Sequence, residues 1–181
     1  MEAAEQQRLT VPWNHWHEPI IASVVASYSR PTYVEIGVFR GDCLAAVTPN
    51  AEQAHGVDVT FGRLACDVTG ARLWEMRSDD FFRAYDGPPA DVIFVDGDHA
   101  YEQARADTLN ALELLADDGC LFLHDTWPVL AAATERFTCG EVYRVVDELR
   151  EDPQLDVSTI RRWPGLTLVT RRRPALMSRN R

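Results

Sequence analysis

The sequence contains no lysine, since all 18 of its basic residues are arginine. This absence excludes enzymes that form a Schiff base through lysine and nucleotide-binding proteins that need a P-loop lysine. Long apolar runs are also absent, and none approaches the length of a membrane span. The acidic N-terminus, MEAAEQQ, lacks the features of a signal peptide. We therefore expect a protein without a membrane partner.

Cysteine is scarce as well, and its spacing forms no C-x-x-C pair. This pattern excludes a zinc finger and a dense disulfide framework, so we expect a reduced, cytoplasmic setting. The four cysteines are Cys43, Cys66, Cys120 and Cys139.

Positive charge is too sparse for a nucleic-acid surface. The net charge is −10 at pH 7, whereas nucleic-acid affinity depends on clustered basic residues. The one basic cluster, residues 171–173, is interpreted as a solvated end after the last strand, with a nucleic-acid or membrane tail as the alternative. We expect no nucleic-acid partner.

The apolar pattern predicts one α/β domain. At 181 residues the chain is long enough to bury a core, and we expect an N-terminal arm (1–17), a domain (18–173) and a C-terminal tail (174–181). Strands are predicted at 33–36, 54–57, 73–76, 91–95, 120–123, 155–160 and 166–170, and helices at 17–28, 42–47, 79–85, 101–116 and 142–149. This order predicts a doubly wound, mostly parallel seven-stranded sheet with an antiparallel last strand.

Two helices carry more detailed expectations. In the helix at 101–116, an apolar stripe of Leu109, Leu112 and Leu115 is expected to face the sheet. The helix at 142–149 is expected to begin with a capping box, in which Thr138 and Glu141 bond each other's backbone.

Acids and imidazoles follow two of the predicted strands. The stretch ADVIFVDGDHAY ends an apolar run with Asp96, Asp98 and His99, and the next strand ends in His124 and Asp125. In open α/β sheets, ligands bind at the carboxyl ends of the strands. We therefore expect these side chains to meet in one ligand-binding crevice.

A second group of residues predicts a cofactor site. The first strand turns into its helix through Glu35-x-Gly37-x-x-x-Gly41, whereas the dinucleotide pattern G-x-G-x-x-G is absent. An acid just before the turn suits a cationic or zwitterionic ligand better than a pyrophosphate. Asp58, at the end of the second strand, suits two ribose hydroxyls.

The adenine ring is expected to lie near Ser78 and Asp79, which follow the third strand. Ribose, adenine and a positively charged head together describe S-adenosylmethionine.

From Tyr33 to about Thr170 the chain resembles class I S-adenosylmethionine-dependent methyltransferases, which have a Rossmann-like fold. Within this class, VDGDHAYE followed by LFLHDTW is similar to the macrocin and mycinamicin sugar O-methyltransferases and their cephalosporin-hydroxylase-like relatives. The resemblance implies that Asp96 and Asp125 hold Mg²⁺ and that His99 or Asp98 removes the substrate proton. Asp96 is also a candidate for contact with the cofactor.

The chain departs from this group at His124, where those enzymes usually carry an acid. A histidine is a softer ligand than Mg²⁺ favours, so His124 either joins Asp96 and Asp125 at a metal or indicates that the metal is not used. The expected function is methyl transfer to a hydroxyl of a small molecule such as a sugar. The alternative is a metal-independent methyltransferase for a carboxylate, amine or phenol.

Plainer interpretations stay open. Asp58 could cap a turn, Ser78 and Asp79 could begin a helix, and the whole chain could be a nicotinamide-dependent oxidoreductase or a silent cofactor-binding subunit. The cluster Trp13-Asn14-His15-Trp16-His17 is either a staple that packs the arm or a wall over the substrate. Cover for the substrate would come from residues 1–17, from residues 127–137, or from a second copy of the chain in a homodimer.

Overall fold

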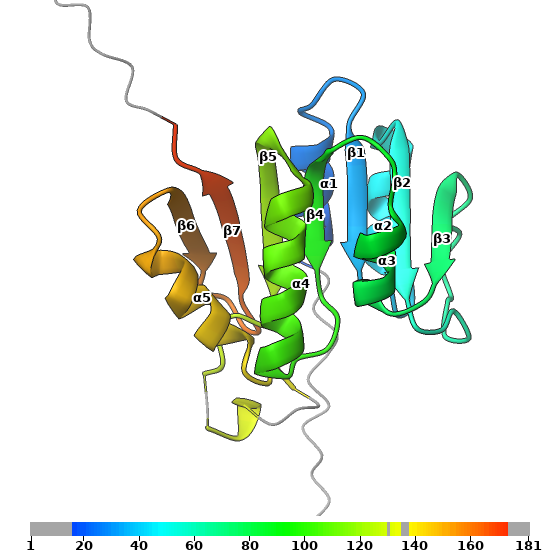
Figure 1. Ribbon diagram of the computed structural model, residues 1–181. Coiled ribbons are helices and arrows are strands. Elements are labelled where there is room, and N and C mark those ends of the chain that lie inside the picture. Colours follow the sequence, from blue (N-terminus) through cyan, green and yellow to red (C-terminus); the bar gives the residue numbers. More distant parts are fainter. Residues whose placement is uncertain (1–15, 130, 135–137, 174–181) are drawn as a thin grey trace, which may run out of the picture.

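Seven strands form one sheet in the order β3-β2-β1-β4-β5-β7-β6 (Figure 1). The computed structural model describes residues 16–129, 131–134 and 138–173. The strands are β1 (Thr32–Ile36), β2 (Gln53–Asp58), β3 (Ala71–Glu75), β4 (Ala90–Val95), β5 (Leu115–His124), β6 (Leu155–Ile160) and β7 (Leu166–Arg171). The first five are parallel, and β7 lies antiparallel between β5 and β6. The predicted doubly wound sheet with an antiparallel end is therefore confirmed.

Helices cover both faces of the sheet. They are α1 (Glu18–Val25), α2 (Asp42–Val47), α3 (Ser78–Ala84), α4 (Tyr101–Leu114) and α5 (Val142–Glu151), with short 3₁₀ helices at Thr48–Asn50 and Ala131–Thr134. Figure 1 shows α3, α4 and α5 in front of the sheet and α1 and α2 behind it. Alternate residues of the buried strands contribute to two cores, one on each face, as the two-residue period of a strand requires.

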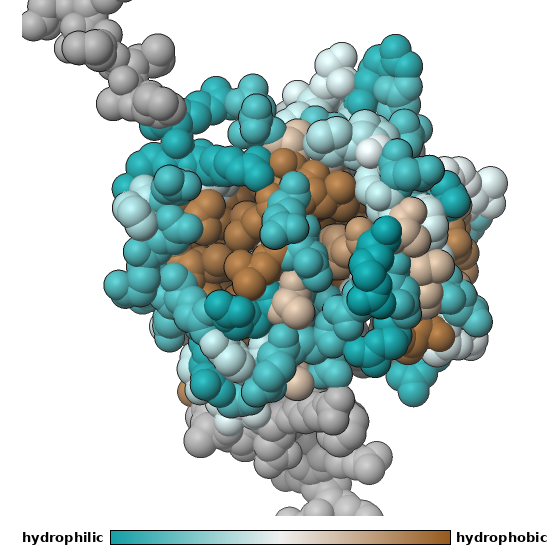
Figure 2. Space-filling view, in the orientation of Figure 1, coloured by the Kyte–Doolittle hydropathy of each residue, from teal (hydrophilic) through white to brown (hydrophobic). Residues whose placement is uncertain are grey.

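The core on the face of α4 and α5 reaches the surface. Figure 2, in the same orientation, shows apolar side chains between these two helices, over β5 and β7, with polar side chains around them. Partly buried residues of this core include Leu112, Leu114 and Val157.

The predicted leucine stripe of α4 is wrong in part. Leu109 is 41% exposed, and the buried face consists instead of Ala104, Asp107, Thr108 and Ala111. These side chains are short, so the helix can lie close to the sheet. Leu112 is partly buried against the core, and Leu115 is buried but is the first residue of β5.

The predicted capping box is also wrong. Helix α5 begins after Glu141 without a side-chain cap, and the Thr138 hydroxyl donates to the carbonyl of Ala133 at 2.7 Å. The Glu141 carboxylate instead accepts from Arg144. Gly140, with a φ of +57°, turns the chain between Thr138 and the helix. Thr138 therefore does not occupy the capping position that the sequence pattern predicted.

The regular alternation of helix and strand fails between β2 and β3, as well as at the final pair, β6 and β7. Residues 59–70, all of which the structure describes, connect β2 to β3 without a helix. This connection packs against the turn after β1, because the backbone N–H groups of Ala65 and Cys66 both donate to the carbonyl of Arg40.

Most of the predicted arm and the predicted tail lie outside the described residues, as do Trp13, Asn14 and His15. Trp16 and His17 are described and pack on the domain, and the helix that follows them is shorter than predicted. Trp16 is buried, and its indole N–H donates to the carbonyl of Trp163. None of the helices in the described ranges has the length and apolar character needed to cross a bilayer.

Candidate active site

The glycine turn after β1 lies directly against the end of β4. Gly37 has a φ of +88°, and a Cβ at this position would lie 2.2 Å from the carbonyl oxygen of Asp96. Any side chain would therefore force β1 and β4 apart. Gly41, with a φ of +83°, precedes the first turn of α2. The structure thus brings the predicted cofactor turn beside Asp96.

Asp58 stabilises this turn through hydrogen bonds to its backbone. Its Oδ2 accepts from the backbone N–H groups of Val38 and Phe39, both at 2.9 Å, and its Oδ1 accepts from Thr60 at 3.2 Å. A carboxylate has about four acceptor sites, and these three bonds use both sites on Oδ2 and one on Oδ1, so one site on Oδ1 is left for a ribose hydroxyl. Ribose binding by Asp58 stays a prediction.

Glu35 lies beneath the turn and not in the crevice. It is 1% exposed, and its carboxyl accepts a hydrogen bond from the Tyr33 hydroxyl at 2.6 Å. Burial raises the pKa of Glu35 to about 8, although the bond from Tyr33 opposes the shift. The carboxyl is therefore mostly neutral at pH 7, and direct contact between Glu35 and the cofactor stays a prediction.

Ser78 and Asp79 begin α3 and are joined to α4. The side-chain amide of Gln103 donates to the Ser78 hydroxyl at 3.2 Å and to Asp79 Oδ1 at 3.3 Å. Asp107 accepts from the same amide at 3.0 Å. Contact of Ser78 and Asp79 with adenine stays a prediction, and Gln103 is a member of this network that the sequence analysis missed.

Four of the five acids and imidazoles that follow β4 and β5 converge into one cluster, as predicted, and Asp98 is the exception. His124 Nδ1 lies 3.0 Å from Asp96 Oδ1 and 3.4 Å from Asp125 Oδ2. His99 Nε2 lies 3.1 Å from Asp125 Oδ2 and 3.8 Å from Asp96 Oδ1. Asp125 adopts a φ of +58°, which is strained for a residue with a side chain. Such strain is often found at functional sites.

Opposite charges shift the pKa values within this cluster. Burial alone would raise the pKa of Asp96, but His124 and His99 outweigh it and hold that pKa below the usual range. Burial alone would lower the pKa of His99, yet its bond to Asp96 and the charge of Asp125 raise it to about 9. The pKa of His124 is likewise raised well above its usual value, against the effect of burial, by the same two carboxylates.

The backbone before α5 orients His99. Its Nδ1 bonds the carbonyl of Thr138, so Nδ1 carries a hydrogen and Nε2 faces the carboxylates. The N–H of Glu141 donates to the carbonyl of His99 at 2.9 Å, and a Cβ on Gly140 would lie 2.3 Å from that oxygen. Nε2 is therefore the atom available as a base or a ligand.

Asp98 lies apart from this cluster, whereas His17 lies against it. Asp98 is exposed, and its Oδ1 accepts from the N–H of Ala100 at the start of α4, so its geometry suits a helix start more than a base. The His17 ring lies 4.3 Å from the His124 ring, centroid to centroid. The aromatic cluster around residue 16 was the only sequence signal for this contact.

The cluster has the spacing of a metal site. One ligand atom each from Asp96, His124 and Asp125 lies within 4.8 Å of the others. Two oxygens and one nitrogen suit divalent ions that accept imidazole, such as Mn²⁺ or Zn²⁺, better than Mg²⁺. Metal binding and the choice of Mg²⁺ stay predictions.

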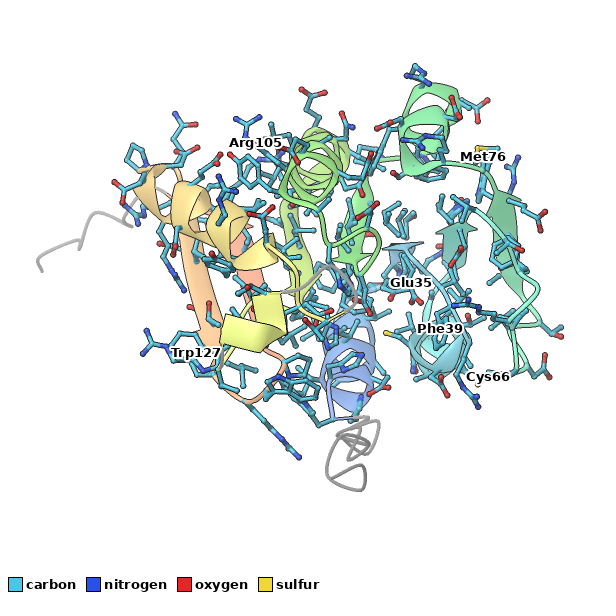
Figure 3. The ribbon with its side chains drawn as sticks, turned by 90° about the horizontal axis from the view of Figure 1, so that it is seen from below. Glu35, Phe39, Cys66, Met76, Arg105 and Trp127 are labelled. Atoms are coloured by element: carbon cyan, nitrogen blue, oxygen red, sulfur yellow. The ribbon has the colours of Figure 1, made fainter. Side chains whose placement is uncertain are left out.

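Figure 3 views the sheet along its strands, from the side where the carboxyl ends of β1, β2 and β4 lie. Phe39, in the glycine turn, and Trp127, in the loop after β5, lie on either side of α1 in this view. Phe39 and Trp127 are therefore separated by α1 in this view.

Comparison with solved structures shows the same fold in several proteins. A cofactor-bound protein from MTB matches with a TM-score of 0.75 and 14% identity, over 91% of this chain and 84% of that chain. An O-methyltransferase from Bacillus cereus in complex with SAH matches with a TM-score of 0.73 and 12% identity, over 88% and 82%. TomG, an O-methyltransferase from Streptomyces achromogenes involved in tomaymycin synthesis and bound to SAM, gives 0.70 and 16%, over 86% and 79%.

The comparison with family models identifies the chain. No curated protein matches it. A family described as a methyltransferase domain matches residues 34–126, more than half of the chain, and this range includes the glycine turn and both strand ends of the cluster. The chain therefore belongs to this methyltransferase family, as its resemblance to the class I enzymes predicted.

Proposed function

We propose that this protein is an S-adenosylmethionine-dependent O-methyltransferase that acts on a hydroxyl of a small molecule, such as a sugar or a related natural product. The observation that carries the proposal is the convergence of Asp96, His99, His124 and Asp125 beside the glycine turn. The O-methyltransferases among the structural neighbours support it, including one bound to SAM and involved in tomaymycin synthesis.

The chain's own residues divide the work. Gly37 and Gly41 allow a close approach of the cofactor, with Asp58 at its ribose and Ser78 and Asp79 near its adenine. The substrate oxygen forms a bond to the sulfonium methyl, the carbon–sulfur bond breaks, and its electron pair stays on sulfur, which leaves as a neutral thioether. The hydroxyl proton goes to a base.

His99 is our candidate for that base. Its Nε2 faces the cluster while its Nδ1 is held by the carbonyl of Thr138. Because Asp96 and Asp125 raise the pKa of His99 to about 9, the imidazole must lose a proton before it can accept one. A group that neutralised these carboxylates would lower the pKa of His99 and so favour its neutral imidazole, which can accept a proton.

Asp96, His124 and Asp125 would hold a divalent ion, if one is used, and His99 lies close enough to join them. Such an ion would lower the pKa of the substrate hydroxyl and fix its orientation. The nitrogen donor favours a transition ion over Mg²⁺. The second candidate function, a metal-independent methyltransferase, is favoured by the ion pairs, because two imidazolium groups already balance two carboxylates.

Calorimetry and turnover together test the proposal. We expect S-adenosylhomocysteine to bind the purified protein, and Asp58→Ala to weaken that binding. Formation of S-adenosylhomocysteine from S-adenosylmethionine should depend on an added acceptor with a hydroxyl. A protein that binds neither compound would contradict the function, and full turnover after exhaustive chelation would select the metal-independent alternative.

A further inference from the structure

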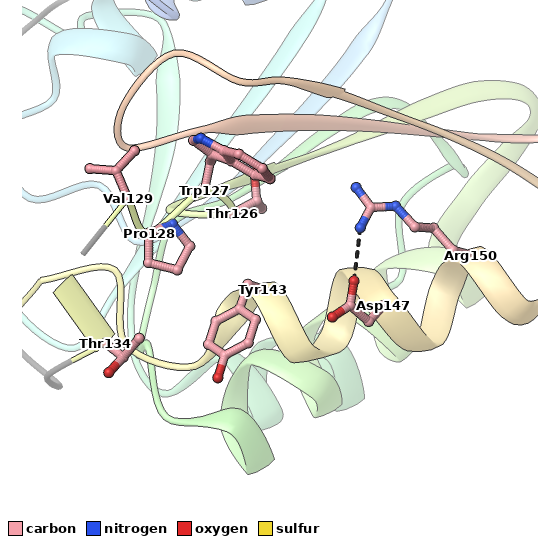
Figure 4. A pocket seen from close by; sticks show the side chains of 8 residues that line it. All are labelled: Thr126, Trp127, Pro128, Val129, Thr134, Tyr143, Asp147 and Arg150. Carbon is pink, nitrogen blue, oxygen red and sulfur yellow. Dashed lines mark hydrogen bonds and ion pairs between the residues drawn. The ribbon is translucent and has the colours of Figure 1, made fainter. Parts of the chain in front are cut away.

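A cavity of about 370 Å³ opens between the loop after β5 and helix α5. Figure 4 shows Trp127 and Thr126 on one side of it, Tyr143 on the facing helix, and Asp147 and Arg150 at one end. Its volume lies near the lower end of the range of small-molecule sites, about 300 to 1,000 Å³. A site of this size accommodates a small ligand and not a folded partner. The residues that line it are Thr126, Trp127, Pro128, Val129, Thr134, Tyr143, Asp147 and Arg150.

The walls of the cavity are aromatic and held in place. The backbone N–H of Trp127 donates to the carbonyl of Pro164 at 2.8 Å, and the guanidinium of Arg161 lies 4.6 Å from the centre of the Trp127 ring. Tyr143 occupies the first turn of α5, opposite Trp127. Two aromatic side chains on facing walls are suited to binding the faces of a ring.

One end and one wall of the cavity carry polar groups. At the end, Arg150 Nη1 donates to Asp147 Oδ1 at 2.8 Å, and Arg150 Nη2 donates to the Thr159 hydroxyl at 2.8 Å. On the wall beside Trp127 lies Thr126, which is 3% exposed. Within the described part of the chain, its hydroxyl has no hydrogen-bond partner. A buried hydroxyl without a partner is unfavourable unless a ligand or water completes it.

The wall formed by Thr126 and Trp127 continues in the chain from the candidate active site. Thr126 follows Asp125, whose Oδ2 lies 3.1 Å from His99 Nε2. On the facing side, the N–H of Glu141 donates to the carbonyl of His99, and Tyr143 comes two residues later. A ligand that fills the cavity would therefore have one edge against the wall that continues from Asp125 and another edge near Asp147 and Arg150.

We propose that this cavity binds the methyl acceptor, and that the acceptor is a small hydroxylated ring with polar groups on two edges. The inference rests on the proposed function and adds the place and chemical class of the substrate. One hydroxyl enters the cluster past Thr126, the ring faces contact Trp127 and Tyr143, and the distal polar group bonds Asp147 or Arg150. A planar phenolic ring and a sugar ring both satisfy this description, so the test includes one of each.

Ligand-observed NMR titrations on protein saturated with S-adenosylhomocysteine test the assignment. The probes are 4-hydroxybenzyl alcohol and methyl α-glucopyranoside, with phenol as the probe that lacks a second polar edge. We expect at least one of the first two to bind, and Trp127→Ala to weaken that binding about tenfold or more. Preferential binding of one probe identifies the ring as phenolic or as a sugar.

Asp147→Asn tests the polar end. We expect it to weaken binding of the two-edged probe about threefold to tenfold, and to leave phenol binding unchanged. The matched control is Asp156→Asn, since Asp156 is a similarly exposed aspartate that pairs with Arg172 at 3.0 Å and does not line the cavity. It should leave the binding of all probes unchanged.

Circular dichroism checks that each variant is folded. Should Trp127→Ala not fold, Tyr143→Leu on the opposite wall, a half-buried helix position, is expected to cause a similar loss of binding. Equal probe binding by the wild type and the aromatic variants would overturn the assignment, as would the absence of binding of both two-edged probes. Failure to bind S-adenosylhomocysteine would instead overturn the proposed function itself.

Discussion

Replacing Glu35 with glutamine should remove a large pH dependence of stability. Glu35 is fully buried, and its pKa rises from its ordinary value of 4.5 to about 8 because burial disfavours the charged form. The folded state therefore holds the proton more tightly than the unfolded state. The resulting stabilisation is complete below pH 4.5 and is lost as the pH rises toward 8.

The size of the effect follows from the two pKa values. Each tenfold change in proton affinity corresponds to about 1.4 kcal/mol, so the full loss between the acidic and alkaline limits is about 5 kcal/mol. Between pH 5.5 and 8.5, linkage predicts a loss of about 3 kcal/mol. Glu35→Gln keeps an acceptor for the Tyr33 hydroxyl but cannot ionise, so the variant lacks this loss.

Urea unfolding at several pH values between 5.5 and 8.5 measures the difference in free energy between wild type and variant. Only the change of this difference with pH is used, so a constant cost of introducing the amide cancels. From pH 5.5 to 8.5 the free energy of unfolding of the variant should rise by about 3 kcal/mol relative to that of the wild type. Glu52→Gln is the control. The ion pair with Arg30 lowers the pKa of Glu52, so its contribution changes only below its ordinary value of 4.5. A difference that is flat with pH for Glu35→Gln would refute the burial argument.

Three further predictions concern the site and its support. Gly37→Ala should destabilise the fold by more than about 2 kcal/mol in urea unfolding and abolish calorimetric binding of S-adenosylhomocysteine, because φ is +88° and the new Cβ would meet the Asp96 carbonyl; wild-type behaviour would contradict the close approach. His99→Gln should lower turnover about a hundredfold or more while cofactor affinity stays near normal, and an unchanged rate would exclude His99 as the base. Arg171→Ala should lower Tm by roughly 4 to 8 °C in a calorimetric scan, since Arg171 bonds three carbonyls around the end of α4; exposed Arg173→Ala is the control, and equal shifts would refute this role.

Much of the site could be predicted because its signals are local. A buried parallel strand shows as an apolar run, and the chemistry-bearing residues follow directly after it, as Asp96 and Asp125 do. The glycine turn could likewise be predicted from the sequence, because the φ of +88° at Gly37 favours a residue without a Cβ.

Contacts between distant segments were less predictable. The Thr138 carbonyl that orients His99 lies 39 residues away, and the contact between the His17 and His124 rings joins the start of the domain to the end of β5. Neither contact leaves a spacing pattern in the sequence. The burial of Ala104 in place of Leu109 likewise depends on how closely α4 approaches the sheet, which a helical period alone does not give.

The sequence by itself determined the class of sheet, the glycine turn and the presence of acids and imidazoles at two strand ends, because strand period and turn chemistry are short-range properties. Only the tertiary structure decided how these groups share their protons and which atoms face the crevice. Burial and pairing are set by the whole fold, so Glu35 became a mostly neutral support beneath the turn, and His99 became a charged partner of two carboxylates. The cavity beside Trp127 also exists only where the loop after β5 meets α5.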